Sequence, residues 1–159
     1  AAVKFKQASG QYFDVREAYL TRLDELKIAG DSAGATALTD RWETGSSMYK
    51  ATHPICRDQL DNSDGRIQRR RTLEQMRVIV NDPGAPQAEH FGALKELIGY
   101  WDAYTIRKAA LAEDESARGR DRMERFKTQF SAALEGYVAE HPEVRSFWLS
   151  VLRPEAGFD

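Results

Sequence analysis

The sequence holds a single cysteine, Cys56, among its 159 residues. One cysteine excludes an internal disulfide, and a cysteine-based zinc site would need three or more further ligands from elsewhere in the chain. A reducing compartment, or indifference to redox conditions, fits this composition best. The opening residues AAVKFK include no methionine, which fits either a processed product or one piece of a longer protein.

Signals for membranes and export are also missing. No apolar run approaches the ~20 residues that a membrane-spanning helix needs. No basic start followed by an apolar stretch and a small-residue cleavage site is present. The formal net charge of −2 gives no overall attraction to nucleic acids or acidic membranes. We therefore expect a chain that does not bind membranes and carries no export signal.

Catalytic and cofactor motifs are absent from the sequence too. It has no glycine-rich phosphate loop, no nucleophile elbow and no readable serine–histidine–aspartate grouping. The Glu-x-x-His pairs of helical di-iron sites do not occur. His53 and Cys56 are spaced as H-x-x-C, but Pro54 between them is expected to place them on different elements. We predict no catalytic residue, no cofactor and no metal site.

What remains predicts helices almost throughout. Apolar residues recur at spacings of three and four along segments bounded by capping residues, prolines and glycines. The segments expected to be helical are about 3–29, 31–53, 66–80, 86–113, 116–140 and 143–152, with a short piece at 55–60. The composition of DNSDG at 61–65 predicts a turn. We predict an all-α fold of five or six helices with short connections, mostly an antiparallel bundle or an array of helical hairpins.

The proline- and glycine-rich stretch 81–86 is the expected boundary in this fold. We expect 1–159 to form a single helical domain, or two lobes, 1–82 and 86–159, that meet near 81–86. Pro86 is well placed as the first residue of a helix. Pro154 is expected to end the last one.

Two stretches share the pattern Tyr-x-Ala-x-His-Pro: YKATHP at 49–54 and YVAEHP at 137–142. We interpret them as matched helix ends rather than as a two-histidine site. The helix dipole favours a histidine at a helix C-terminus, and proline disfavours helical geometry in the residue before it. Whether the match reflects duplication stays open.

The stretch after Pro142 is the candidate contact surface. It is a short helix rich in apolar side chains, so it must pack on the chain's own core or on a partner. Adjacent aromatic side chains point in different directions from one short helix, and one of them is expected to cover a neighbouring surface. We predict protein contacts at Phe147, Trp148, Val151 and Leu152. A protein partner or a homo-oligomer is therefore expected.

Charged side chains leave two alternatives open. A basic helix predicts contact with nucleic acid or with an acidic protein, although nearby carboxylates also fit a solvated, salt-bridged helix face. Its residues are Arg66, Arg69, Arg70, Arg71 and Arg77. Asp102, among the aromatics of YWDAY, fits a helical enzyme or small-ligand binder, a buried carboxylate that holds a tyrosine or an arginine, or the polar edge of its helix.

The final stretch, YVAEHPEVRSFWLSVLRPE, resembles helical segments of long virion proteins of tailed bacteriophages, of the tape-measure or internal-polyprotein type. HPEVRSFW and LRPE carry the resemblance. It implies a structural role in a virion and no catalytic residues. The lack of a long heptad tract departs from a simple tape-measure rod. The sequence alone therefore favours a non-enzymatic structural or protein-interaction module, in the cytoplasm or in a virion.

Overall fold

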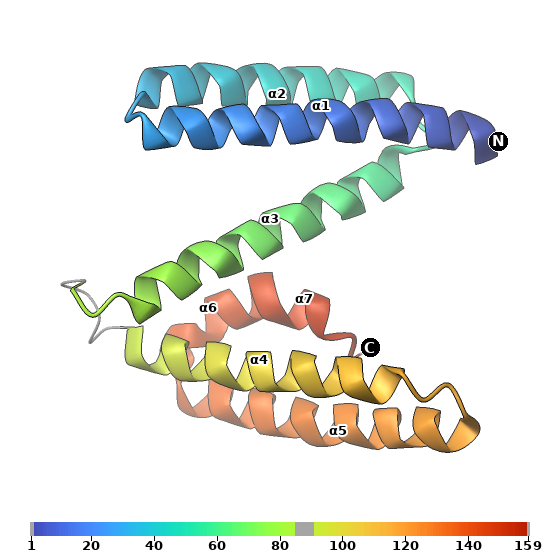
Figure 1. Ribbon diagram of the computed structural model, residues 1–159, viewed down its shortest axis with the longest axis vertical. Coiled ribbons are helices and arrows are strands. Elements are labelled where there is room, and N and C mark those ends of the chain that lie inside the picture. The colour runs from blue at the N-terminus through green and yellow to red at the C-terminus, as the bar shows by residue number, and fades with distance from the viewer. Residues whose placement is uncertain (1, 85–90, 159) are drawn as a thin grey trace. The chain divides into compact units, whose positions relative to one another are not determined.

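The computed structural model describes residues 2–84 and 91–158 of the chain (Figure 1). Every regular element in these residues is a helix, and no strand occurs among them. The all-α prediction is therefore confirmed. The chain divides into an N-terminal unit, Ala1–Gly65, and a C-terminal unit, Arg66–Asp159.

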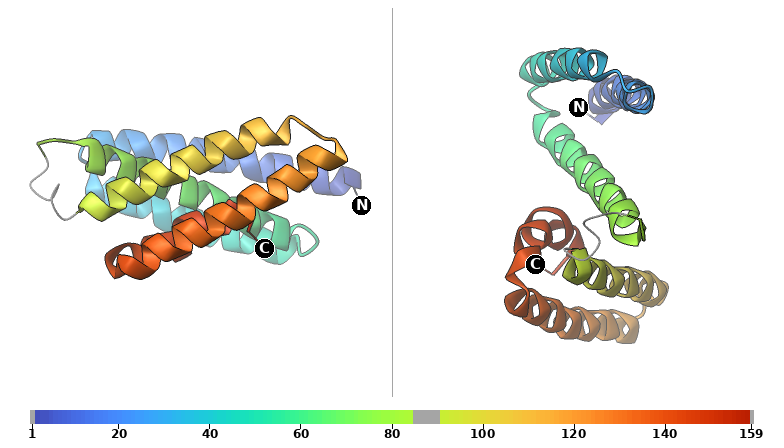
Figure 2. Two further views of the ribbon diagram at one scale, coloured as in Figure 1. Left: turned by 90° about the horizontal axis from the view of Figure 1, so that it is seen from below. Right: turned by 90° about the vertical axis from the view of Figure 1, so that its left-hand side faces the viewer.

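Two long helices, α1 (Ala2–Ile28) and α2 (Ser32–Thr52), form the hairpin of the N-terminal unit. The views in Figures 1 and 2 agree that they run side by side. Gly30 has a φ of +73°, the left-handed conformation that a glycine just after a helix commonly adopts. Asp31 then caps α2 by accepting a hydrogen bond of 2.8 Å from the backbone N–H of Gly34. This end of the hairpin is thus fixed by local sequence.

The third helix, α3 (Arg57–Asn81), corrects the predicted turn at 61–65. Asp61, Ser63 and Asp64 of this stretch instead contact side chains of the hairpin. Asp61 and Asp64 both pair with Lys50 of α2, at 2.7 and 2.8 Å. Leu60, one turn into α3, is fully buried. Tertiary contacts on one face of the helix outweigh the local preference for a turn.

The division between the units also differs from the expected boundary at 81–86. The helix does end at Asn81, before Pro83, as the sequence predicts. However, Leu73, Met76 and Val80 of α3 pack into the core of the C-terminal unit. The first turns of α3 therefore belong to the N-terminal unit and the rest to the C-terminal unit. Pro86 lies outside the described residues.

The C-terminal unit also contains a helical hairpin, and shorter helical pieces follow it. Helices α4 (Gly92–Ala112) and α5 (Ala117–Glu140) form the hairpin. The chain then continues through η2 (Pro142–Val144), α6 (Arg145–Phe147), η3 (Trp148–Leu152) and α7 (Arg153–Ala156). These pieces pack back on the hairpin, where the hydroxyl of Tyr104 donates a 2.6 Å hydrogen bond to the backbone oxygen of Ala156.

Pro154 does not end the last helix, contrary to the sequence-based prediction. The helical path continues to Ala156 and ends at Gly157, whose φ is +70°. A π-helical turn, η3, stands directly before Pro154, and the N–H of Arg153 donates to the backbone oxygen of Trp148. A widened turn of this kind accommodates a residue that lacks an N–H and crowds the carbonyl four residues earlier.

Two glycines inside helices are expected to respond in opposite ways to alanine. Gly45→Ala should raise the free energy of unfolding by about 0.5–1 kcal/mol, because nothing lies within 4 Å of a Cβ at this position in α2. Gly119→Ala should lower it by about 1–2 kcal/mol, because its Cβ would lie 2.2 Å from the backbone oxygen of Asp114. Urea unfolding followed by circular dichroism tests both. Changes of the same sign would contradict this account.

Candidate functional site

The residues that the sequence singled out for protein contact lie in the core of their own unit. Trp148, Val151 and Leu152 are buried among α4 and α5, and Phe147 is partly buried against the same core. The indole N–H of Trp148 donates a 3.2 Å hydrogen bond to Glu135. Of the two destinations that the sequence left open for this helix, the structure selects the chain's own core. The chain itself covers Trp148, Val151 and Leu152, whereas Leu149 is 48% exposed, and contact with a partner stays a prediction.

Some arginines of α3 form ion pairs within the C-terminal unit, and others are exposed. Arg69 pairs with Glu155 of α7 at 2.6 Å, and Arg77 pairs with Asp102 of α4 and with Glu74. Arg66 and Arg70 are exposed, and Arg71 is half-buried. The salt-bridged interpretation therefore holds for Arg69 and Arg77. Contact with nucleic acid stays a prediction.

Asp102 holds an arginine, which is one of the roles that the sequence suggested for it. Its carboxylate accepts a hydrogen bond from the Arg77 guanidinium, and the two side chains are each about one-third exposed. This hydrogen bond is the leading reason why the pKa of Arg77 lies above its usual value. Asp102 therefore joins α3 to α4.

The two histidine–proline corners have the same geometry. The histidine ring stacks on the tyrosine one turn earlier with centroids 4.0 Å apart, both for Tyr49 and His53 and for Tyr137 and His141. In both corners, the histidine Nδ1 donates a 2.9 Å hydrogen bond to the backbone oxygen of that tyrosine. A helix-terminal carbonyl is thereby satisfied. The interpretation of these stretches as matched helix ends is confirmed.

Both corners also direct the next residues of the chain in the same way. The N–H of Cys56 donates to the oxygen of His53 at 3.0 Å, and the N–H of Val144 donates to that of His141 at 3.1 Å. Cys56 and Val144 are both buried against the hairpin of their unit. Each corner therefore turns the chain back across the hairpin that it has just left.

A charged cluster at the start of α3 holds the N-terminal unit together. Asp64 accepts hydrogen bonds from Tyr12 at 2.5 Å, from Arg16 at 2.8 Å and from Lys50 at 2.8 Å. Burial alone would raise the pKa of Asp64, but these bonds outweigh it and the pKa lies below 3.8. Burial and the bond to Asp64 raise the pKa of Tyr12 to about 12. Asp64 therefore stays ionised and Tyr12 stays neutral around neutral pH, as a structural clamp requires.

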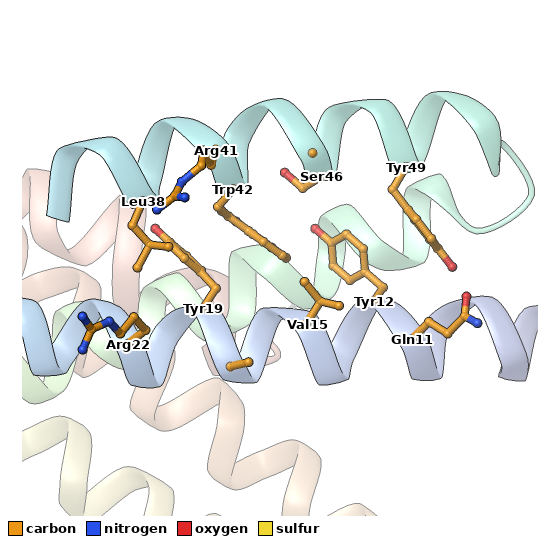
Figure 3. Close-up of a pocket in the computed structure, with 12 residues that line it drawn as sticks. Gln11, Tyr12, Val15, Tyr19, Arg22, Leu38, Arg41, Trp42, Ser46 and Tyr49 are labelled. Carbon is orange, nitrogen blue, oxygen red and sulfur yellow. The ribbon is translucent and has the colours of Figure 1, made fainter. Parts of the chain in front are cut away.

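An apolar groove runs along the α1–α2 hairpin, with a volume of about 760 Å³ (Figure 3). Trp42 stacks on Tyr19 with centroids 4.9 Å apart and 7° between the ring planes. Tyr12 packs on Trp42 at 5.3 Å. The groove is lined by Gln11, Tyr12, Val15, Ala18, Tyr19, Arg22, Leu38, Arg41, Trp42, Gly45, Ser46 and Tyr49.

The groove meets the start of α3 at Tyr12, which lines the groove and donates a hydrogen bond to Asp64. Arg16 and Lys50, which hold α3, are not among its lining residues. Val15, the neighbour of Arg16, points about 100° away from it around α1 and is 60% exposed. The aromatic stripe of this hairpin is therefore covered by α3 on one side and left open along the groove on the other.

Two small residues, Gly45 and Ala18, line the groove. Gly45 is the feature of the sequence that could have indicated this surface. Leu38, Trp42, Gly45 and Tyr49 form an apolar stripe at helical spacing, which predicts a core face. The stripe is interrupted at Gly45, which faces open space, and Ala18 of α1 also lines the groove. A glycine inside an aromatic stripe is thus the feature that marks this surface.

The C-terminal unit has a smaller groove, of about 480 Å³, on its own hairpin. Three of its lining residues stand at the same distances before the histidine–proline corner as Trp42, Gly45 and Tyr49 do. They are Phe130, Ala133 and Tyr137. Its charged lining residue is Glu140, whereas Arg22 and Arg41 supply the charge in the N-terminal unit. Each hairpin has a groove of its own, and the charged residues that line the two grooves are opposite in sign.

No group of three or more His, Cys, Asp and Glu side chains in residues 2–84 and 91–158 is placed to hold a metal ion. None of the helices described is long and apolar enough to cross a membrane. Comparisons of the chain with protein-family models, with curated proteins and with solved structures found no match. What the protein does must therefore be inferred from its own side chains.

Proposed function

We propose that the chain is a helical protein-interaction module, structural rather than enzymatic, and that the α1–α2 groove is its contact surface. The observation that carries this proposal is an aromatic-lined groove whose rim residue Val15 is 60% exposed. Exposed apolar surface of this kind is costly in water and is typical of protein contact sites. Trp and Tyr side chains, such as Trp42 and Tyr19 here, are enriched among residues that dominate binding energy.

The proposal moves the predicted contact surface from the C-terminal helix to the N-terminal hairpin. It keeps the prediction of a protein partner or a homo-oligomer. The resemblance of YVAEHPEVRSFWLSVLRPE to segments of virion proteins would place the module in a larger assembly, and this stays a prediction.

A photo-crosslinking amino acid tests the proposal in the cells that make the protein. Benzoylphenylalanine at position 45, inside the groove, is expected to give a discrete covalent adduct with one partner or with a second copy of the chain. The matched control is the same residue at position 99 of α4, because Gly99 is also an exposed helix glycine with open space around it. No adduct from position 45, or the same adducts from both positions, would overturn the proposal.

Binding measurements with the purified protein and the purified crosslinked partner then distinguish binding in the groove from chance proximity. Gly45→Trp should fill the groove and abolish binding to the crosslinked partner, while Gly99→Trp should leave binding unchanged. Circular dichroism of both variants checks that the helices remain. Undiminished binding by folded Gly45→Trp would place the contact elsewhere and contradict the proposal.

A further inference from the structure

The charge of the α1–α2 groove is one-sided. Among the described residues that line it, Arg22 and Arg41 are charged and none carries a carboxylate. Both arginines are exposed. Arg22 pairs with Glu25 at 3.0 Å, but that pair is solvent-exposed and weak. Together with Leu38, the arginines mark one end of the groove, and Tyr49 and Gln11 mark the other (Figure 3).

The length of the groove fits a helix. Its lining on α1 extends from Gln11 to Arg22, a rise of about 16 Å, which is three turns of α-helix. The groove is open to solvent along this length, as the exposure of Val15 shows. A small ligand favours a cleft that encloses most of its surface, whereas an amphipathic helix lays one face into a groove and leaves the other in water.

The C-terminal unit contains a helical segment packed on a hairpin, although none of its residues lines the 480 Å³ groove of that unit. There, a short helical segment seats Trp148, Val151 and Leu152 on the α4–α5 hairpin. Aromatic and aliphatic side chains on one helical face thus complement a hairpin of this design. Because Arg22 and Arg41 lie at one end of the groove, a bound helix needs complementary negative charge only at that end.

We propose that the α1–α2 groove binds an amphipathic helix of a partner protein, one that carries apolar side chains along one face and carboxylates at the end beside Arg22 and Arg41. This inference rests on the proposed function and specifies the partner's chemistry. The apolar face supplies the contact area, and the carboxylates set the direction in which the helix lies. Carboxylates in the first turn of the bound helix also stabilise that helix through its dipole.

Two fluorescently labelled peptides provide the probe. Each is a helix-stabilised peptide of about 14 residues, four turns, with Leu and Phe on one face. One carries two glutamates in its first turn, and the other carries two lysines there. The protein is expected to bind the glutamate peptide about tenfold more tightly at low salt, with the difference shrinking as salt rises. Fluorescence anisotropy measures both affinities.

Charge reversal in the protein provides the matched controls. Arg41→Glu should remove or invert the preference between the two peptides. Arg70→Glu, which reverses an exposed arginine of α3 outside the groove, should leave the preference unchanged. Gly45→Trp should abolish binding of both peptides.

The possible failures distinguish this inference from the proposed function. Equal affinity for the two peptides, lost in Gly45→Trp, would overturn the charge requirement and leave the groove as a contact surface. No binding of either peptide, with a crosslinked partner still obtained from position 45, would overturn the helical occupant alone. If position 45 also gives no adduct, both proposals fail.

Discussion

Replacing Trp148 with alanine is expected to lower the free energy of unfolding of the C-terminal unit by about 3–5 kcal/mol. Trp148 is fully buried and packs edge-on against Trp101, with ring centroids 6.5 Å apart. Phe158 lies on it at 6.1 Å. Truncation leaves a large cavity between the hairpin and the C-terminal segment, and it also removes the indole hydrogen bond to Glu135.

Hydrogen exchange followed by mass spectrometry measures this loss unit by unit. Protection in α4 and α5 should fall, while α1 and α2 retain theirs. Leu149→Ala is the matched control, because Leu149 is 48% exposed and its truncation should cost about 0.5 kcal/mol or less. Unchanged protection in Trp148→Ala, together with weaker self-association, would instead restore the sequence-based prediction that Trp148 contacts a partner.

Asp64→Ala is expected to destabilise the N-terminal unit by about 2–3 kcal/mol. The substitution leaves Tyr12, Arg16 and Lys50 without the carboxylate that they share. These partners come from both helices of the hairpin, so their loss frees α3 from α1 and α2 together. Asp61→Ala is the control: Asp61 also pairs with Lys50, but its side chain is 51% exposed, and its loss should cost about 1 kcal/mol at most.

The pH dependence of the Asp64 contribution follows from its lowered pKa. A carboxyl group whose pKa is lower in the folded state stabilises the fold above its unfolded pKa, and the stabilisation is lost as the pH falls through the folded value. The difference in stability between wild type and Asp64→Ala should therefore be constant around neutral pH. It should shrink below the usual carboxyl pKa of 3.8. A difference that persisted undiminished at lower pH would show that Asp64 acts by packing alone.

Local features account for the parts of this fold that the sequence predicted. The end of the first helix near residue 29, the start of the second near 31 and the two histidine–proline corners each depend on residues close together in the chain. Such features are decided by backbone sterics and by hydrogen bonds within one turn, so they can be read without knowing what packs where. The π-helical turn before Pro154 was not predicted, and Ala156 in the helix that follows it is fully buried.

The predictions that failed or changed involve residues whose partners lie far away in the sequence. Asp61 and Asp64 read as turn formers, yet they bind Lys50, which lies on another helix. Trp148 read as a contact for a partner, yet α4 and α5 enclose it. An apolar or charged side chain has the same local signature whichever surface satisfies it, so spacing alone could not choose.

The sequence by itself determined the helices, their caps and the repeated corner, because helical periodicity and chain termination are properties of neighbouring residues. The tertiary structure alone decided which aromatic faces are covered. It places the C-terminal apolar segment in its own core and leaves the Tyr19–Trp42 stripe open beside Gly45. Burial is a property of pairs of surfaces brought together by folding, and so the groove emerged only when α1 and α2 were placed side by side.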